Sequence, residues 1–196
     1  MAVTLRFAVP ADASALLEIY GPYVTDTSVT FEYHVPTEEE FVRRIRSISA
    51  GFPYLVCERD GFILGYAYAH PPWERAAYQW NAELTVYLRQ NCRGGGLGTA
   101  LYTALLELLR AQGIRTALGC VTHPNPASEH LHKKLGFQVC ARFHRSGWKL
   151  GRWFDVQWFE KSLCGEAAAP QPPRSIHAVP PETVARILTA CTAGLC

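Results

Sequence analysis

The sequence predicts one domain of the α+β class, in which helices flank a mixed, mostly antiparallel α/β sheet. The dipeptide Asp60-Gly61 lies between two strand-like runs, 54–59 and 62–69, which is a strong signal for a tight hairpin of antiparallel strands. Residues 79–122 then read as strand, loop, helix and strand, which is a β-loop-α-β unit. Together these segments indicate a mixed sheet.

The N-terminal part of the chain predicts one strand followed by two helices. Residues 4–10 suit a short strand, and Asp12 is expected to cap an amphipathic helix after it. Thr37 and Glu40 match a capping box, so a second helix is expected from there to Gly51, which ends it. The predicted hairpin follows this helix.

The middle of the chain predicts a strand at 79–88, a helix at 98–111 that Gly113 ends, and a buried strand at 116–122. The first of these strands alternates in character, so it presents one apolar and one more polar face. The apolar face carries Ala82, Leu84, Val86 and Leu88, and the other face carries Asn81, Glu83, Thr85 and Tyr87.

The C-terminal part predicts a helix at 126–135 and two last strands at 137–143 and 154–160, so that the domain spans residues 1–163. Residues 164–196 are rich in proline and alanine and are typical of a flexible extended tail. A short helix fits residues 182–191, but it is below the roughly 12 residues that an isolated helix needs. We therefore expect it to fray.

Composition excludes several classes of protein. Apolar residues make up 48% of the 196 residues, but no apolar run approaches the ~18 residues that a membrane span requires. The N-terminus shows no export signal, so the cytoplasm is the expected compartment. The seven cysteines include no C-x-x-C pair and are expected to be reduced, and the histidines lack metal-site spacing. A net charge of +2 does not indicate a nucleic-acid surface.

Four glycines follow the strand at 79–88, in the run Q-N-C-R-G-G-G-L-G-T. The run lacks the G-K-[ST] ending of a Walker loop, and Thr99 stands where a dinucleotide fingerprint needs glycine. The remaining pattern is R-x-x-G-x-G at the start of a helix, where free N–H groups and the helix dipole favour an anion such as pyrophosphate. A flexible turn is the alternative, and the surrounding sequence decides between them.

That surrounding sequence resembles the GNAT superfamily of N-acetyltransferases. The glycine run is similar to its acyl-CoA loop, and N-P-A-S-E-H-L-H-K-K-L-G-F has His132 where the superfamily often has tyrosine. This histidine is typical of the phosphinothricin acetyltransferase-like branch of the superfamily. Three further stretches are similar to that branch: I-Y-G-P-Y-V-T-D-T-S-V-T-F-E, Y-Q-W-N-A-E-L-T-V-Y and W-K-L-G-R-W-F-D-V. The resemblance covers about residues 4–163. It implies the GNAT acyl-CoA N-acyltransferase fold, with a sheet splayed at the cofactor site.

The resemblance implies acetyl-CoA as co-substrate. Main-chain groups near Val86 to Leu88 are expected to face the acyl end and to stabilise the oxyanion. The loop is expected to grip pyrophosphate, while a helix near residue 125 lines the remainder. The predicted cofactor-binding residues are Val86, Tyr87, Leu88, Arg93, Gly94, Gly95, Gly96, Leu97, Gly98, Thr99, Asn125, Ser128 and Lys134. A solvated helix end is the alternative for Lys134.

Two residues are predicted to be catalytic. An amine must be neutral to attack, yet an α-amino group has a pKa of roughly 8, so a base is needed. The resemblance places that base, acting directly or through water, at Glu83. His132 is expected to give a proton to the departing thiolate or to assist the base, and a packed helix histidine is the alternative. Cys92 and Cys120 have no histidine spaced as a local partner, so direct transfer is expected.

The branch acts on small amino-acid-like amines: phosphinothricin, methionine sulfone, methionine sulfoximine and some L-amino acids. A substrate carboxylate needs a bidentate arginine, so Arg75 with Tyr78 is predicted to hold it, and Phe31, Glu32 and Glu83 to line the same pocket. Open alternatives are a protein N-terminus, a polyamine, or a non-catalytic CoA-binding regulator. The resemblance also implies a homodimer, with the last two strands as a plausible contact.

Overall fold

The computed structural model describes residues 3–165, 170–193 and 195. Its centre is a seven-stranded sheet of order β1-β2-β3-β4-β5-β7-β6, in which β4 and β5 are parallel and the other described neighbours are antiparallel. The predicted mixed, mostly antiparallel sheet is therefore confirmed. The strands are β1 (Thr4–Phe7), β2 (Tyr54–Arg59), β3 (Phe62–His70), β4 (Asn81–Leu88), β5 (Thr116–His123), β6 (Gln138–Lys149) and β7 (Arg152–Ser162).

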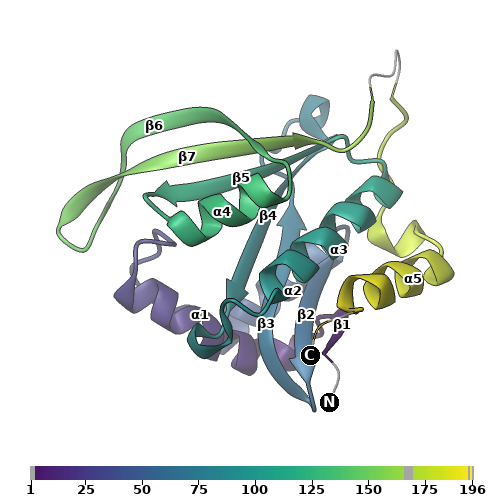
Figure 1. Ribbon diagram of the computed structural model, residues 1–196, viewed down its shortest axis with the longest axis horizontal. Coiled ribbons are helices and arrows are strands. Elements are labelled where there is room, and N and C mark those ends of the chain that lie inside the picture. Colours follow the sequence, from purple (N-terminus) through teal and green to yellow (C-terminus); the bar gives the residue numbers. More distant parts are fainter. Residues whose placement is uncertain (1–2, 166–169, 194, 196) are drawn as a thin grey trace.

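Helices cover both faces of the sheet (Figure 1). Helices α1 (Ala13–Asp26) and α2 (Glu38–Ser49) pack on one face. Helices α3 (Leu97–Gln112), α4 (Pro126–Lys134) and α5 (Pro181–Thr192) lie on the other. Helix α3 is the most deeply buried of them, because its leucines repeat at helical spacing and face the sheet.

The two faces of the sheet differ in the side chains that fill them. Beneath α3 the core is mainly aliphatic, with Leu101, Leu105 and Leu108 completely buried. Beneath α1 and α2 it is rich in tyrosine. The buried tyrosines on that face are Tyr20, Tyr23, Tyr54, Tyr66 and Tyr87. Because each of them brings a hydroxyl group into the interior, this face needs more specific polar contacts than the aliphatic one.

The predicted hairpin joins β2 and β3. Asp60 and Gly61 both have positive φ, 54° and 78°, as a tight hairpin turn with right-handed strand twist requires. The strands pair in antiparallel register from Tyr54↔Tyr68 to Arg59↔Phe62, with an irregularity after Cys57. This part of the sequence prediction is confirmed.

The sheet opens between β4 and β5. Their parallel pairing runs only from Asn81↔Thr116 to Glu83↔Leu118, although β4 continues to Leu88 and β5 to His123. Beyond Glu83 the two strands diverge, so the edges that face each other form a fork. The expected splay of the sheet is present.

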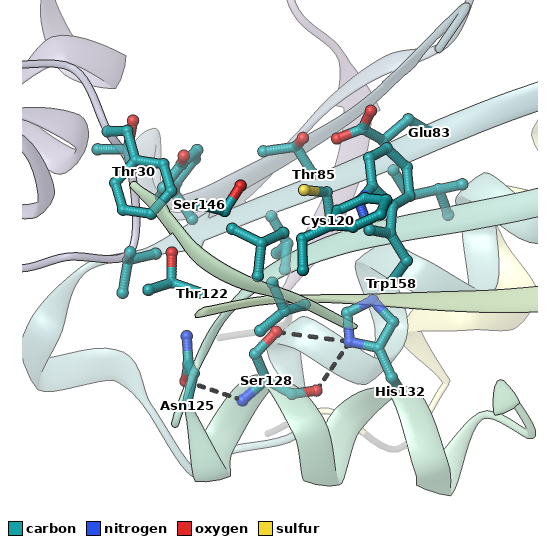
Figure 2. Close-up of a pocket in the computed structure, with 18 of the residues that line it drawn as sticks. Thr30, Glu83, Thr85, Cys120, Thr122, Asn125, Ser128, His132, Ser146 and Trp158 are labelled. Atoms are coloured by element: carbon teal, nitrogen blue, oxygen red, sulfur yellow. Dashed lines mark hydrogen bonds between the residues drawn. The ribbon is translucent and has the colours of Figure 1, made fainter. Parts of the chain in front are cut away.

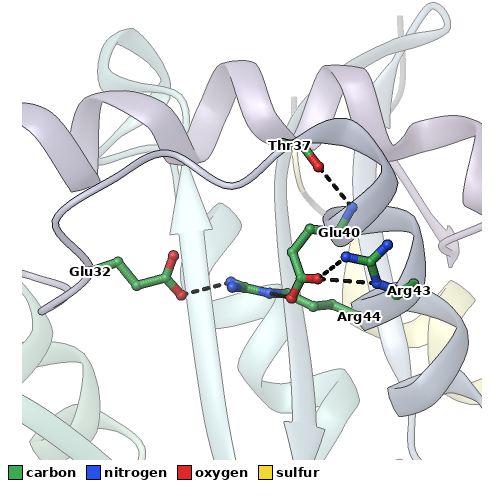
Figure 3. Close-up of polar contacts among 5 residues, drawn as sticks. All are labelled: Glu32, Thr37, Glu40, Arg43 and Arg44. Carbon is green, nitrogen blue, oxygen red and sulfur yellow. Dashed lines mark hydrogen bonds and ion pairs between the residues drawn. The ribbon is translucent and has the colours of Figure 1, made fainter.

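The caps of the first two helices differ in part from the predictions. Thr37 accepts a hydrogen bond from the Glu40 N–H (3.2 Å), but the Glu40 carboxylate binds Arg43 and Arg44 (Figure 3). The prediction for Asp12 is wrong: its side chain makes no cap bond to α1. Its carboxylate instead accepts from Arg6 (2.8 Å), which stands on the neighbouring strand and offers a charged partner.

The last two strands are longer than predicted. β6 and β7 form a hairpin whose turn contains Leu150 and Gly151, both at positive φ. The hairpin extends away from the rest of the molecule (Figure 1), and the sequence between 143 and 154 continues the strands instead of forming a loop. Trp148 and Trp153 pair across it, with ring centroids 5.4 Å apart.

The helix predicted in the tail is not frayed in the structure, contrary to expectation. Helix α5 packs on α3 and β1 and buries Ile187, while Ile176 and Val179 are buried just before it. Main-chain bonds also fix the extended part, from Arg174 N–H to the Gln112 carbonyl (2.8 Å) and from Ile176 N–H to the Gly51 carbonyl (3.0 Å). Burial of its apolar stripe on α3 supplies the stability that the helix lacks alone.

Among the described residues no helix is both long and apolar enough to span a bilayer. Six cysteines, from Cys57 to Cys191, are free thiols, whereas Cys196 lies outside the described residues.

Candidate active site

A cavity of about 460 Å³ lies in the fork between β4 and β5. Residues of β4 border one side and residues of α4 the other, as Figure 2 shows for Glu83 and His132. The structure thus brings both predicted catalytic residues into one cavity. The predicted residues that line it are Phe31, Glu83, Val86, Tyr87, Asn125, Ser128 and His132.

Glu83 stands at the last β4–β5 pair, where the fork begins. Burial raises the pKa of its carboxyl group, and His70, directly opposite on β3, lowers it to a smaller extent. A carboxyl whose pKa is raised by burial holds its proton more tightly than an exposed one, which suits a general base near neutral pH. The structure therefore supports the role predicted for Glu83, and it adds His70 as a neighbour that the sequence motifs did not indicate.

His132 is almost completely buried, with only 1% of its surface exposed. Its Nδ1 lies 2.8 Å from the Ser128 carbonyl, which can only accept, so Nδ1 carries the proton. Burial lowers the pKa of the ring, so the imidazole is neutral and Nε2 presents a lone pair. Of the two roles considered for His132, the geometry favours accepting a proton over giving one to a thiolate.

Close packing fixes the His132 ring in this orientation. The ring stacks on Phe159 with centroids 4.8 Å apart and meets Phe137 edge-on at 5.0 Å. On β5, a Cβ atom built on Gly119 would lie only 2.2 Å from His132 Nε2. Only glycine at this position lets the strand approach the ring so closely.

Tyr102 on α3 is a buried polar residue that the sequence analysis missed. Its hydroxyl donates to the Leu84 carbonyl (3.0 Å) and lies 3.5 Å from His132 Nε2. Leu84 follows the last residue that pairs with β5, so the tyrosine takes the place of a strand partner at the fork. A lone tyrosine among the leucines and alanines of the buried helix face was the available signal, because a buried hydroxyl needs a partner.

The direction of the main-chain groups along β4 follows from the pairing with β3. Arg89 N–H donates to the Leu64 carbonyl (2.8 Å), so alternate residues from 89 downward bond to β3. Tyr87 therefore directs its main chain toward β3, so of the main-chain groups expected near Val86 to Leu88, those of Tyr87 do not face the fork. Leu84, Val86 and Leu88 face the fork.

Two of these three residues already have partners. The Leu84 carbonyl accepts from Tyr102, and the Leu88 carbonyl and N–H both contact the Tyr23 hydroxyl, at 2.7 and 3.3 Å. Within the described part of the chain, Val86 is left with its main-chain groups facing the fork. Val86, more than Leu88, is therefore placed to pair with a ligand.

The glycine loop leads directly into the first turn of α3. Gly96, in left-handed conformation (φ 81°), precedes the helix, and Gly94 also has positive φ (88°). Around Gly94 and Gly95 a built Cβ would meet no atom within 4 Å, so the loop has open space in front of it. The start of a 16-residue helix, exposed main chain and Arg93 beside it fit a bound pyrophosphate.

The helix at 126–134 begins beside the same cavity. Asn125 caps it by accepting from the Ser128 N–H (3.2 Å), and both residues line the cavity (Figure 2). Glu129 accepts from the Asn125 N–H (3.0 Å) and lies 2.8 Å from His123, which holds the start of the helix in place. Lys134, by contrast, is exposed in the last turn of α4, which fits the alternative interpretation of this residue as part of a solvated helix end.

Cys120 is a thiol within the cavity, opposite Glu83 (Figure 2). Burial and the nearby Glu83 carboxylate raise its pKa to about 12, so it carries almost no thiolate at neutral pH. An acyl-cysteine route through Cys120 is therefore disfavoured, in line with the expectation of direct transfer.

The residues predicted to hold the substrate are not all brought together. Phe31 lines the cavity, but the Glu32 carboxylate is bound to Arg44 (2.7 Å) on α2 (Figure 3). Arg75 lies in a second cavity, of about 670 Å³, which the tail helps to form. Tyr78 is exposed and packs on Trp73, with ring centroids 4.8 Å apart. Neither Arg75 nor Tyr78 lines the cavity that contains Glu83, so the predicted carboxylate clamp is not assembled there.

Other residues that line the fork cavity were not singled out from the sequence. They come from four separate segments: the loop after α1, strand β4, strand β5 and the β6–β7 hairpin. No local pattern marks them, because each segment reaches the cavity only in the folded chain. They are Val29, Thr30, Leu84, Thr85, Val121, Thr122, Phe143, Ser146, Val156 and Trp158.

Comparison with known proteins agrees with this geometry. Residues 5–158 match the family model described as "Acetyltransferase (GNAT) domain". A phosphinothricin N-acetyltransferase of Streptomyces viridochromogenes is 33% identical over 177 residues, covering 90% of this chain and 94% of the relative. An L-methionine sulfoximine/L-methionine sulfone acetyltransferase of Pseudomonas paraeruginosa is 32% identical, covering 87% and 100%.

A solved structure is similar throughout. A phosphinothricin acetyltransferase from Sinorhizobium meliloti in complex with acetyl-CoA superposes with a TM-score of 0.82 at 36% identity, covering 93% of this chain and 98% of that one.

Proposed function

Because this chain belongs to the GNAT acetyltransferase family and is an acetyl-CoA-dependent N-acetyltransferase, we propose that its acceptor is the primary amine of a small amino-acid-like molecule. The observation that carries the proposal is the fork cavity. There a carboxyl group with a raised pKa, Glu83, lies beside the free main-chain edge of Val86. The cavity volume of about 460 Å³ suits a small acceptor molecule better than the surface of a folded protein.

In this mechanism the residues of the chain hold both reactants and accept one proton. Acetyl-CoA, when bound, supplies the acetyl group as a thioester. Glu83, directly or through water, takes the proton of the substrate ammonium so that the amine is neutral. Attack of this amine would form the C–N bond and break the C–S bond of the thioester, so that coenzyme A would leave as a thiol with the second proton that the amine gives up. Val86 N–H donates to the acyl group, and the glycine loop with Arg93 holds the pyrophosphate. His132 stays neutral and, through Nε2, assists proton acceptance.

The proposed substrate class is phosphinothricin, methionine sulfone, methionine sulfoximine or a related L-amino acid. The names of the two curated relatives support it, since both act on molecules of this kind. The cavity supports it as well, because Thr30, Thr85 and Ser146 offer hydroxyl groups while Phe31 and Trp158 offer apolar surface. Such a lining can hold a short side chain with one polar head.

An amine panel tests the proposal. Purified protein and acetyl-CoA are incubated with each of the amines above, with neutral amino acids, with spermidine and with a peptide that mimics a protein N-terminus. Release of free thiol is measured. The proposal expects the highest kcat/KM with one of the amino-acid-like amines.

Two other outcomes would contradict it. Preferred turnover of the peptide or spermidine would assign the chain to a different acceptor class. Tight acetyl-CoA binding with no turnover of any amine would indicate a non-catalytic CoA-binding regulator, although Glu83 and His132 in one cavity argue against that reading.

We also propose that the protein forms a homodimer through the β6–β7 hairpin. β6 is the last strand of the sheet, and an edge strand exposes main-chain groups that can pair with another chain. The hairpin exposes five large apolar side chains, and such a concentration is typical of an interface. They are Val139, Phe143, Trp148, Leu150 and Trp153.

Light scattering after gel filtration tests the dimer. Wild-type protein is expected at twice the mass of the chain, and a double variant, Trp148→Glu with Leu150→Glu, at the mass of one chain. A wild-type monomer at micromolar concentration would reject this interface.

A further inference from the structure

Tyr23 on α1 contacts both parts of the cofactor site. Its side chain is buried, with 6% of its surface exposed. The hydroxyl donates to the Leu88 carbonyl (2.7 Å) and also accepts from the Leu88 N–H (3.3 Å). The guanidinium carbon of Arg93 lies 5.3 Å from the centre of the same ring. One side chain therefore connects the end of β4 with the arginine of the glycine loop.

The hydroxyl decides which main-chain groups of β4 remain open. Leu88 faces the fork, as Leu84 and Val86 do, and without a partner its N–H and carbonyl would compete with Val86 for a ligand. Tyr23 occupies both groups of Leu88, and Tyr102 occupies the Leu84 carbonyl. The strand thus offers a defined pair of groups at Val86 instead of a loose edge.

The ring acts on the other part of the site. A guanidinium over an aromatic face is attracted by the ring quadrupole and loses part of its freedom. Arg93 is at the start of the glycine run, so the ring of Tyr23 keeps its charge beside the loop. Tyr87 packs edge-on against Tyr23, with centroids 4.9 Å apart, and holds the ring itself in place.

We propose that Tyr23 is a positioning residue for acetyl-CoA, with two separable actions. Its hydroxyl prepares β4 for the acyl and pantetheine end, and its ring prepares Arg93 for the pyrophosphate end. This inference rests on the proposed function. Neither action requires Tyr23 to touch the cofactor, so the residue acts through Leu88 and Arg93. If Tyr23 served only to fill the core, removing its hydroxyl would not affect the binding of one end of acetyl-CoA more than the other.

Calorimetry with the whole protein and two parts of the cofactor tests this separation. The probes are acetyl-CoA, S-acetylpantetheine and adenosine 3′,5′-bisphosphate. Tyr23→Phe keeps the ring and removes the hydroxyl. It should therefore weaken the binding of acetyl-CoA and of S-acetylpantetheine by about three- to tenfold, which corresponds to the loss of one hydrogen bond. The bisphosphate should bind as before. Arg93→Lys keeps the positive charge but loses the planar group that stacks on the Tyr23 ring. It should weaken the binding of the bisphosphate and of acetyl-CoA by about two- to fivefold, and leave the affinity for S-acetylpantetheine unchanged.

Tyr33→Phe is the matched control, because the Tyr33 hydroxyl also donates to a main-chain carbonyl, but to that of Trp148 on β6 and not to one on β4. It should leave all three affinities unchanged. Equal binding by wild type and Tyr23→Phe would overturn the proposal, as would a uniform loss for all probes, which would indicate a general loss of stability. If wild-type protein itself gave no heat with acetyl-CoA, the proposed function would fail instead.

Discussion

Strand β4 has two halves with different surroundings. Residues 81–83 pair with β5, and Glu83 also pairs with β3, whereas residues 84–88 pair with β3 alone. The first half ends at Glu83, and the position of Glu83 is fixed by both neighbouring strands, β3 and β5. The second half has an open edge that tyrosine hydroxyls close at Leu84 and Leu88.

This difference separates two tasks within eight residues. A base must be held rigidly, because a misplacement of about 1 Å can cost 10²-fold in rate. A cofactor, in contrast, needs unpaired main-chain groups, which a fully paired strand does not have. In the proposed mechanism the fork lets one strand do both. The predictions below test whether the two halves are as distinct in function as they are in structure.

Replacement of Glu83 by glutamine should have the largest effect. The glutamine amide keeps the shape of the carboxyl group but cannot accept a proton, so kcat should fall by about 10²- to 10⁴-fold, the usual contribution of general base catalysis. Because the second half of β4 is untouched, the dissociation constant for acetyl-CoA should stay the same. Steady-state kinetics and calorimetry measure the two quantities. A parallel loss of acetyl-CoA binding would show that the halves are not independent.

Replacement of Gly119 by alanine should have the next largest effect, by pushing His132 out of place across the fork. The added Cβ would lie 2.2 Å from Nε2 of a ring that is packed on all sides. Overpacking of this kind costs about 1–3 kcal/mol of unfolding free energy, and kcat should fall by roughly tenfold or more. Urea denaturation and kinetics are the measurements.

Gly51→Ala is the control for that variant, because a Cβ there would meet nothing within 4 Å. Its stability and kcat should match the wild type. If Gly119→Ala behaved like Gly51→Ala, the ring of His132 would not be fixed by β5.

The pH dependence should reveal the buried carboxyl. Burial raises the pKa of Glu83 above its ordinary value of 4.5, so kcat should fall as pH drops through that raised value, as the base becomes protonated. The Glu83→Gln variant should lack this acidic limb. Stability changes in the opposite sense: the folded state holds the proton more tightly, so the Glu83 contribution is greatest below pH 4.5 and is lost as pH rises through the raised pKa.

Two measurements check the pH prediction. The kcat profile of both proteins is recorded from about pH 4 to about pH 9, a range that spans the ordinary and raised carboxyl values, and unfolding free energies are compared over the same range. Glu83→Gln should gain stability relative to wild type as the pH rises from 4.5. An identical acidic limb in both proteins would assign it to another group.

Replacement of Cys120 by serine should have the smallest effect. The thiol faces Glu83 across the fork, but with a pKa of about 12 it does not act as a nucleophile. We expect kcat within about twofold of wild type, because a hydroxyl of similar size replaces the thiol and direct transfer needs neither. Initial-rate patterns at varied acetyl-CoA and amine should intersect. Parallel lines, or loss of activity in the variant, would restore a covalent route.

Much of the fold followed from local patterns. The Asp60-Gly61 turn, the leucine spacing of α3 and the glycines that end the helices each act within a few residues, so the sequence alone could place them. The errors were at points where a partner on another element decided the outcome. Asp12 pairs with Arg6 instead of capping α1, and the tail helix is stable only against α3.

The site divides in the same way. Glu83, His132 and the glycine loop were found because their motifs are continuous in the chain. Tyr23 and Tyr102 were missed, since their hydroxyls reach β4 from 65 and 18 residues away. Arg75 was predicted beside Glu83 but lies in another cavity, because nothing in a linear motif states which way the following turn directs the chain.

The sequence by itself determined which chemical groups this protein has: a strand glutamate, a glycine-rich loop at a helix start and a histidine on the next helix. Only the tertiary structure decided that β4 and β5 part after Glu83, that Val86 keeps its main chain open, and that the His132 ring is neutral. The reason is physical. Residue type is local, whereas the pairing of a main-chain group and the pKa of a side chain depend on the atoms that folding brings around them.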